Sequence, residues 1–535
     1  MTQVATVRRS SRGARAGSAS KVILGTIGLV IALALWQLGS VTGVISPRSI
    51  PAPTDIFVAL VGLLGTGAFW LAVWNTVSVA LFGIVVVIAI ATPLALAIHR
   101  SAGVRESTWF LIEFLKPIPP VALIPLGLLL WGPTEVLKLV LVVFASLWPL
   151  LTQLIYGLRE VSGTALEMSK VYRLSPWQRT SRVVLPSVLP FALTGLRISV
   201  TIALIVAIVV EYIGGVSGLG QDLVLSQLNG LLVQTYAIIL ATGFLGLIFN
   251  GLLAALSTGA LLARLRAGEA VMNDGRTLRR GTGLTLLRIW LPITIVVLWW
   301  FASANSTSLY FPPLSVIAEE LFTEWFGPRF LSDLLPSLVN FGVGFALAVI
   351  LGTLLGLLLG LSRVARELTA PIVNFLRSLP PPALIPVVLI IFGIGAPMSI
   401  ALITIGGIWP TLLNTIDGVR SVDPQVREMV RSYRINRWQY VTRVVLPNAS
   451  PQIFAGYRIT LQISIILIVV SEMVGATKGL GFYVLQSQQL FLVPQTWAGT
   501  IVLGVLGYLL TLIFVQVEKR VLRWQLRMRK AMGSA

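Results

Sequence analysis

The sequence predicts an all-α polytopic membrane protein of about twelve transmembrane helices, arranged as two parallel-oriented six-helix repeats. Three observations support this prediction: the chain repeats itself at a fixed offset, it holds long segments nearly free of charge, and its basic residues gather in alternate loops. Of the 535 residues, 56% are hydrophobic and 11% are charged. Soluble domains carry roughly a quarter charged residues, so this composition favours a membrane protein.

The second half of the chain repeats the first half at an offset of 261 residues. Trp148-Pro149 recurs as Trp409-Pro410, and the segment 182–186 recurs as 443–447. Five further residues, Gly195, Arg197, Glu211, Gly218 and Gly220, recur as Gly456, Arg458, Glu472, Gly479 and Gly481. The period is far longer than the repeats of solenoids or propellers. We therefore expect two copies of one structural unit, related by a pseudo-twofold axis.

Charge-poor segments predict where each unit crosses the membrane. A spanning segment needs about 20 apolar residues, and it must satisfy its own backbone hydrogen bonds, which favours helix. The predicted spans lie near 22–44, 69–98, 112–131, 135–157, 188–213 and 235–263, then near 286–305, 332–361, 372–393, 397–416, 449–474 and 496–518. The third span of each half is the least regular, because prolines interrupt it.

The distribution of positive charge predicts the orientation of these spans. The formal net charge is +20, and 34 of the 40 lysines and arginines fall on one side of the predicted membrane. Positive loops stay in the cytoplasm, so we expect a multi-pass inner-membrane protein with both termini inside. With six spans in each unit, both units enter the membrane in the same direction. This arrangement explains the charge without nucleic-acid binding.

These predictions divide the chain into five parts. We expect a basic cytoplasmic tail over 1–21, a first unit over 22–266, a cytoplasmic linker over 267–283, a second unit over 284–524 and a cytoplasmic tail over 525–535. The first apolar run is too long for a signal peptide and no A-x-A site closes it, so it predicts an uncleaved span after a disordered tail. The linker is polar and rich in turn-forming residues.

Several kinds of catalytic and metal chemistry are excluded by composition. The chain has no cysteine and a single histidine, His99. Thiolate metal sites and His-based triads are therefore not available, and we predict neither a metal site nor catalytic residues. No G-x-x-x-x-G-K-S/T phosphate loop is present, so the chain does not supply an ATP site of its own.

The longest repeated cytoplasmic loops, 157–186 and 418–447, contain the same polar and aromatic residues at the same places. The repeated set is Glu167, Met168, Tyr172 and Arg173 in the first loop and Glu428, Met429, Tyr433 and Arg434 in the second. One interpretation is an amphipathic helix held on anionic membrane lipid by its arginines and Trp177 or Trp438. The other is a shape-specific contact with another protein, which we favour because individual polar residues recur.

These loops resemble the signature of the permease subunits of binding-protein-dependent ABC importers. That signature is Glu-Ala-Ala, three residues, Gly, nine residues and Ile-x-Leu-Pro. Here the segments 167–186 and 428–447 match its spacing. The signature glycine is replaced by Arg173 and Arg434, which predicts that the coupling helix turns differently in this chain.

Other segments are similar to the branch of this family that imports nitrate, sulfonates, taurine or bicarbonate. They include 119–125 with 381–386, 195–197 with 456–458, and 472–475 followed by 479–481. The resemblance implies two fused permease units with the transmembrane fold of type I ABC importers. It also implies two cytoplasmic ABC ATPase subunits that bind ATP and Mg, and an extracytoplasmic solute-binding protein. The expected cargo is a small anion, and the alternatives are a neutral heterocycle (thiamine-precursor or riboflavin-like) or an ion-coupled secondary transporter.

The repeated residues inside the predicted spans are candidates for the translocation path and for its outer lip. Arginine inside a membrane is costly, so Arg197 and Arg458 either face the path and attract an anion or snorkel and pair with a neighbouring group. Trp148 and Trp409 precede prolines that predict kinks, and either line the path or pack structurally. For the outer lip the candidates are Glu211, Glu472, Gly218, Gly220, Gly479 and Gly481, with a structural role favoured for the two glutamates.

Overall fold

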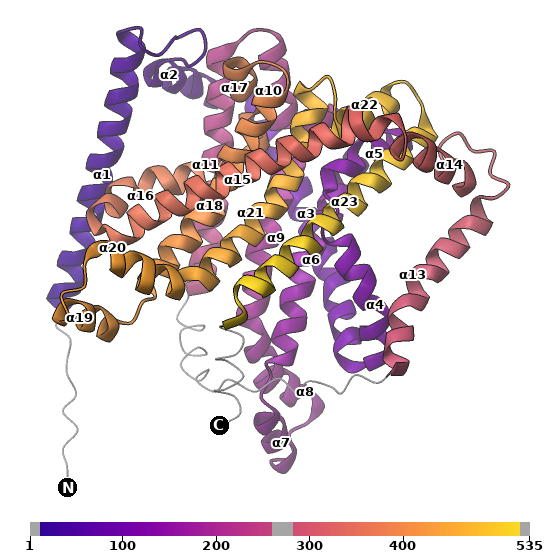
Figure 1. The fold of residues 1–535 in the computed structure, drawn as a ribbon, viewed down its shortest axis with the longest axis horizontal. Coiled ribbons are helices and arrows are strands. Elements are labelled where there is room, and N and C mark those ends of the chain that lie inside the picture. The colour runs from indigo at the N-terminus through magenta and orange to yellow at the C-terminus, as the bar shows by residue number, and fades with distance from the viewer. Residues whose placement is uncertain (1–10, 259–281, 525–535) are drawn as a thin grey trace.

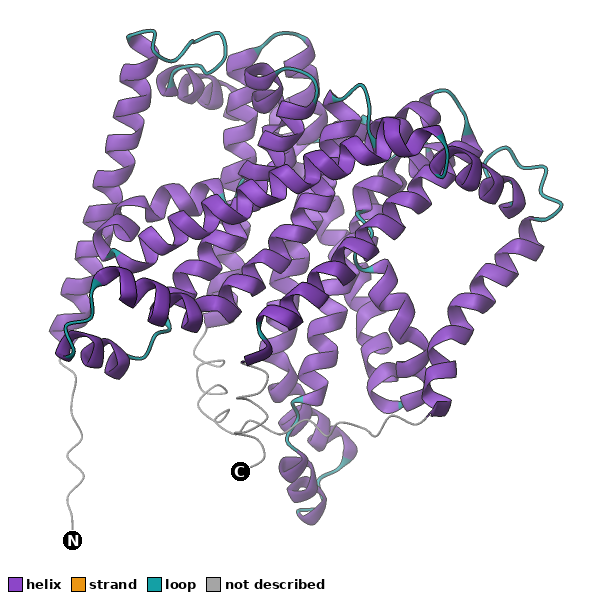
Figure 2. Cartoon of the chain, in the orientation of Figure 1, coloured by secondary structure: helices purple, strands orange, loops and turns teal. Residues whose placement is uncertain are grey.

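The computed structural model describes residues 11–258 and 282–524. These residues form two sets of helices in the same order (Figure 1). Figure 2 shows that the regular elements of these residues are helical. The first set is α1 (Ser11–Val41), α2 (Pro53–Leu64), α3 (Gly67–Arg100), α4 (Ala102–Leu115), α5 (Ile124–Trp131), α6 (Glu135–Arg159), α7 (Gly163–Val171), α8 (Pro176–Arg179), α9 (Leu185–Gly214), α10 (Leu219–Leu228) and α11 (Leu232–Thr258). The second set is α13 (Thr282–Ser303), α14 (Leu314–Trp325), α15 (Leu335–Leu361), α16 (Arg363–Leu376), α17 (Ile385–Phe392), α18 (Ala396–Arg420), α19 (Pro424–Ser432), α20 (Arg437–Tyr440), α21 (Leu446–Gly475), α22 (Leu480–Gln489) and α23 (Val493–Val521). The all-α membrane fold is confirmed.

Short turns of other helix types complete both sets at matching places. Single 3₁₀ turns, η1 (Pro120–Leu123) and η4 (Pro381–Leu384), precede α5 and α17. Single π turns, η2 (Thr180–Val184) and η5 (Val441–Val445), join α8 to α9 and α20 to α21. We call the end of the bundle with α7, α8, α19 and α20 the basic face, and the end with α2, α10, α14 and α22 the opposite face (Figure 1).

The core of each unit is three long helices, α3, α6 and α9 in the first and α15, α18 and α21 in the second. Small residues let these helices approach closely, as is common in membrane bundles. A stripe of glycines on α15 faces α18: Gly344, Gly352, Gly356 and Gly360. Gly195 on α9 and its counterpart Gly456 on α21 allow a second close helix contact. A Cβ at Gly195 would lie about 3 Å from the backbone of α6, and a Cβ at Gly456 would lie about 3 Å from the backbone of α18.

The third predicted span of each half is wrong as a single crossing helix. In its place, α4 and α5 meet at 85° and α16 and α17 meet at 90°. The breaks fall on prolines, which donate no backbone hydrogen bond and fix φ. These are Pro117, Pro119 and Pro120 in the first half and Pro380, Pro381 and Pro382 in the second. Among the described residues, nine helices are long and apolar enough to span a membrane, or 11 if each bent pair counts as one span. The apolar part of α13, Arg288–Ser303, falls below that length.

The first helix of each unit packs on the bent pair of the other unit. In Figure 1, α1 lies beside α16, and α13 lies beside α4. A Cβ on Gly28 of α1 would lie 2.0 Å from the Leu368 carbonyl oxygen of α16, so the two backbones touch. Where α13 packs on α4, the Arg288 guanidinium contacts the Glu106 carboxylate at 2.7 Å, and the Trp290 indole donates to the Ser107 hydroxyl. The two units are thus interlocked.

The turns of the bent pairs also reach across to the other unit. Gly246 of α11 contacts the Ser378 carbonyl, and its counterpart Gly507 of α23 contacts the Pro117 carbonyl. Aromatic rings pack beside both contacts, with Phe244 against Phe375 at 5.5 Å and Phe114 against Tyr508 at 5.6 Å between ring centroids. The interface between the units is therefore built twice, around the same pseudo-twofold axis.

The start of the chain differs from the prediction. Helix α1 begins at Ser11 rather than near residue 22, so part of the segment predicted to be a disordered tail is helical. Most of the predicted linker 267–283 and the predicted tail 525–535 lie outside the described residues.

We predict that Gly28→Val destabilises the protein, because the larger side chain forces α1 away from α16. Overpacking of this kind costs about 1–3 kcal/mol. The melting temperature of the detergent-purified chain, followed by tryptophan fluorescence, should fall by several degrees. The control is Gly342→Val on α15, where a Cβ meets no atom within 4 Å. Equal melting temperatures for the two variants would contradict the close packing of α1 on α16.

Candidate functional site

Two exposed helical segments at the basic face carry the residues predicted to form a protein contact. Ser162 caps α7 by accepting a hydrogen bond from the Ala165 N–H, and Asp423 caps α19 by accepting from Gln425. The caps hold α7 and α19 as short helices, with Glu167 and Glu428 exposed on them. Large apolar side chains beside these glutamates are also exposed: Met168, Tyr172, Trp177, Met429, Tyr433 and Trp438. Such apolar clusters on an otherwise charged surface are typical of binding sites.

The expectation that the turns at Arg173 and Arg434 differ from a turn built around glycine is wrong. Their φ angles are 51° and 50°, so both arginines keep the left-handed conformation that suits glycine. The turn is held by the Arg173 N–H, which donates to the Lys170 carbonyl, and by the equivalent bond from Arg434 to Arg431. The backbone is therefore the one that a glycine would adopt, and the arginine side chain is added to it at a conformational cost.

A cavity of about 220 Å³ lies where the second unit's bent pair meets the first unit. Its walls come from α9, α11 and α18 and from the turn 377–381. Most of the lining is apolar, and the polar lining residues include Thr201, Thr242, Asn250, Arg377, Ser378 and Trp409. A mostly apolar hollow with a few polar groups is typical of a small-molecule site.

The four residues predicted for the translocation path occupy different environments. Trp409 lines the cavity together with Pro410. Trp148 is half-buried and packs edge-on against Phe144, with 5.7 Å between ring centroids. Arg458 forms an ion pair with Glu518 of α23, which is the pairing alternative considered from the sequence. Arg197 forms no ion pair with any described residue, and its carbonyl accepts a hydrogen bond from Thr201 at the cavity wall.

At the opposite face, Glu211 ties the end of α9 to the loop before α10. Glu211 is fully buried, and its carboxylate accepts hydrogen bonds from the Gly220 N–H at 3.0 Å and the Thr76 hydroxyl at 2.9 Å. Gly218, at φ 151°, passes so close that a Cβ there would lie 2.1 Å from the carboxyl carbon. The repeated Glu and glycines of the first unit thus form one compact turn.

Lys138 completes this turn, and it is not among the residues predicted from the sequence. Its side chain is fully buried, and its Nζ lies 3.1 Å from Glu211 Oε1 and 2.9 Å from the Ser217 carbonyl oxygen. The available signal was a single lysine beside an apolar segment on the side poor in positive charge. A buried charge needs a partner, and Lys138 has two: the buried Glu211 and the more exposed Glu135, whose carboxylate lies 2.8 Å from Nζ.

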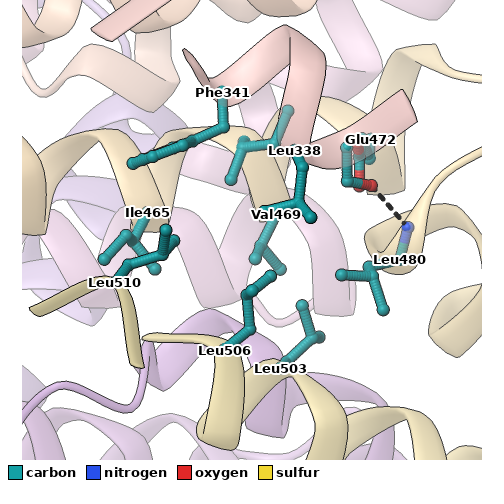
Figure 3. A pocket seen from close by; sticks show the side chains of 11 residues that line it. Leu338, Phe341, Ile465, Val469, Glu472, Leu480, Leu503, Leu506 and Leu510 are labelled. Carbon is teal, nitrogen blue, oxygen red and sulfur yellow. Dashed lines mark hydrogen bonds between the residues drawn. The ribbon is translucent and has the colours of Figure 1, made fainter. Parts of the chain in front are cut away.

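The second unit builds the same turn with different charges. Glu472 accepts from the Gly481 N–H at 2.9 Å, and Gly479 lies against its carboxyl group, as Gly218 does against Glu211. The position of Lys138 is taken by Ser399, whose hydroxyl has no hydrogen-bond partner among the described residues. Asp333 instead accepts from the Gly479 N–H and pairs with Arg329 at 3.2 Å. Figure 3 shows Glu472 at the edge of a small apolar pocket lined by leucines of α23.

We predict that Lys138→Met strongly destabilises the protein, because it leaves the Glu211 carboxylate buried without a counter-charge. Removing one partner of a buried ion pair costs about 3–5 kcal/mol. The loss should appear as a lower melting temperature in detergent, and adding Glu211→Gln should restore part of it. The matched control, Ser399→Ala, removes an unbonded hydroxyl at the mirrored position and should change little. An unchanged melting temperature in Lys138→Met would contradict the role of the pair.

Comparison with known proteins places both units in one family. The family model described as "Binding-protein-dependent transport system inner membrane component" matches residues 89–262 and again residues 348–523. The taurine transport system permease protein TauC of Escherichia coli (strain K12) is 31% identical over 255 residues, which are 46% of this chain and 90% of that protein.

Two further relatives match shorter segments. The putative aliphatic sulfonates transport permease protein SsuC of Bacillus subtilis (strain 168) is 31% identical over 155 residues, 29% of this chain and 56% of that protein. The bicarbonate transport system permease protein CmpB of Synechococcus elongatus (strain ATCC 33912 / PCC 7942 / FACHB-805) is 32% identical over 164 residues, 30% of this chain and 59% of that protein. The chain thus spans just over half the length of these two relatives. With the family model matched twice, this chain belongs to the inner-membrane permease components of binding-protein-dependent transport systems and carries two copies of their domain.

Proposed function

We propose that this chain forms the whole transmembrane path of an ATP-driven importer for a small anion. The relatives are named for the transport of taurine, aliphatic sulfonates and bicarbonate, and each of these solutes carries a negatively charged oxygen group. The cavity at the unit interface, with Arg377 in its wall, is consistent with such a cargo. In this proposal a solute-binding protein delivers the anion to the opposite face.

The proposal places the basic face in the cytoplasm. The predicted loops on that side hold 34 of the 40 lysines and arginines, and positive loops stay inside. The segments α7–α8 and α19–α20 then face the cytoplasm, where ATP is available. Two ATPase subunits, one for each segment, would bind and hydrolyse the ATP with Mg.

The exposed α7–α8 and α19–α20 segments are the observation that carries this proposal. Tyr172 and Tyr433 are each 76% exposed, and Trp177 and Trp438 are 78% and 74% exposed. Aromatic residues of this kind are enriched at protein interfaces. Because the two segments are copies, they present the same surface twice, as docking to two copies of one ATPase fold requires.

A continuous helix connects each docking segment to the opposite face. Helix α8, the π turn η2 and α9 run without a break from Pro176 to Gly214, and the second unit repeats this from Arg437 to Gly475. Helix α9 contributes Thr201 to the cavity wall, and it ends at the turn around the buried Glu211. A displacement of α8 by an ATPase would therefore move the cavity wall and the outer turn together. Closing of the two ATPases would rock the units about the pseudo-twofold axis.

We predict that the double variant Glu167→Lys, Glu428→Lys loses both ATPase co-purification and ATP-dependent transport. Each substitution reverses the charge at the centre of an exposed docking segment. The control is a double charge reversal at the opposite face, Asp55→Lys with Glu319→Lys, which should leave ATPase co-purification unchanged. If the ATPase remains bound to the first variant and transport continues, the docking proposal is wrong.

We predict that Arg173→Gly combined with Arg434→Gly stabilises the two turns but weakens ATPase binding. A left-handed conformation costs an L-residue about 1–2 kcal/mol, and glycine removes that cost. The variant removes two exposed guanidinium groups from the proposed interface. Thermal melting of the purified chain and the Kd of the ATPase report the two effects separately. A melting temperature below that of the wild type, or an unchanged Kd, would contradict this reading.

A further inference from the structure

The two sides of the pseudo-twofold axis differ in charge at the turns of the bent helix pairs. The first unit has Lys116 at its turn, and the second unit has Arg377 at the equivalent position. Lys116 is paired with Glu113 at 3.0 Å, three residues earlier on α4. The residue equivalent to Glu113 is Asn374, which accepts a hydrogen bond from Arg377 at 3.1 Å but carries no charge. The cation is therefore neutralised at one turn and left with its charge at the other.

The arginines of the fifth spans repeat this difference. Arg458 pairs with Glu518, and the residue equivalent to Glu518 in the first unit is Ser257. Within residues 11–258 and 282–524, no acidic side chain pairs with Arg197. The two arginines without an acidic partner are thus Arg377, in the cavity wall, and Arg197, on α9, which forms another part of that wall, so both belong to the cavity side of the axis. The two paired cations, Lys116 and Arg458, lie on the other side.

The cavity is on the side with the unpaired arginines. Arg377 is part of its wall, and Arg197 lies one helical turn before Thr201, which is also in the wall. A volume of about 220 Å³ exceeds the roughly 30 Å³ that a water molecule occupies in the liquid, so a small anion fits with some of its water. The indole N–H of Trp409 supplies an uncharged donor along the same wall, whereas the Thr242 and Ser378 hydroxyls donate to the Ile239 and Asn374 carbonyls.

The part of α23 that corresponds to the α11 wall of the cavity is more apolar. Three residues of α11 in the cavity wall, Thr242, Leu245 and Phe249, correspond to Leu503, Leu506 and Leu510 of α23. Those three leucines line the pocket of Figure 3, which has a volume of only about 20 Å³. The polar Thr242 thus has a leucine as its counterpart. The pocket of Figure 3 lies against α15 and includes neither the turn 116–120 nor α6, so it is not the mirror image of the cavity.

We propose that the fused chain binds its anion on one side of the pseudo-twofold axis, in the cavity between α9, α11, α18 and the turn 377–381, with Arg377 and Arg197 as the cationic groups. The ligand class is a small oxoanion, such as a sulfonate, nitrate or bicarbonate. A small anion in the cavity would form charge-assisted hydrogen bonds with the Arg377 guanidinium. The proposal rests on the proposed anion-import function and adds that the two units contribute unequally to it. A dimer of identical permease units does not allow such a difference, because each substitution would appear on both sides.

The test compares equivalent substitutions on the two sides of the axis. Nitrate, bicarbonate, taurine and ethanesulfonate are titrated into the detergent-purified full chain at constant ionic strength in gluconate, and binding is measured as thermal stabilisation and by calorimetry. We expect at least one of these anions to bind the wild type, Arg377→Gln to weaken that binding at least tenfold, and Lys116→Gln to change it less than twofold. Asn374→Glu, which supplies the second unit with the acid that the first unit has, should also weaken binding tenfold while leaving the arginine in place.

Two results would overturn the proposal. One is that none of the four anions binds the wild type, and the other is that Arg377→Gln and Lys116→Gln weaken binding equally. Should Arg377→Gln fail to fold, Asn374→Glu decides the question in the same assay. ATPase co-purification is measured in parallel on every variant, because it depends on α7–α8 and α19–α20 and not on the cavity. Absence of anion binding by the wild type with the ATPase still bound would reject the one-sided site alone, whereas absence of ATPase binding by the wild type would reject the proposed function.

Discussion

The exchange of first helices between the two units is the contact on which the rest of the structure depends. Helix α1 covers α16 and α13 covers α4, so neither bent helix pair is covered by its own unit's first helix. The bent pairs in turn place their proline-rich turns against α11 and α23 of the opposite unit. A cavity at the interface therefore requires both units, and fusing them in one chain makes their association intramolecular.

Fusion also allows the two copies to diverge, and the divergence is concentrated in charges. The backbone repeats closely: both units have a π turn before the fifth span, a left-handed arginine at the basic face and a glutamate turn at the opposite face. The counter-charges do not repeat, since Lys138 is replaced by Ser399, Glu113 by Asn374 and Glu518 by Ser257. Unpaired charge inside a membrane is costly, so a chain that keeps Arg377 without an acid is expected to use it for function.

Much of this architecture could be predicted from the sequence, because duplication, hydropathy and positive loops are strong signals. The elements that could not be predicted depend on contacts between distant residues. The prolines at 117–120 marked an irregular third span, but its bend of 85° and its packing on the other unit follow from tertiary contacts. Lys138 lies at the start of the predicted span 135–157, and no signal in the sequence indicates its contact with Glu211, 73 residues away. Arg173 was expected to avoid the left-handed region, yet the hydrogen bonds of the turn hold it at φ 51°.

ATP-dependent uptake by the reconstituted complex tests the central claim, that separate ATPases move this permease through its two docking segments. The chain is placed in proteoliposomes with and without its partner ATPase and binding protein, and uptake of labelled anion is followed with ATP or with an imposed proton or sodium gradient. We predict uptake only when the ATPase, the binding protein and ATP are all present. Uptake by the chain alone on an ion gradient, unaffected by ATP, would contradict the account.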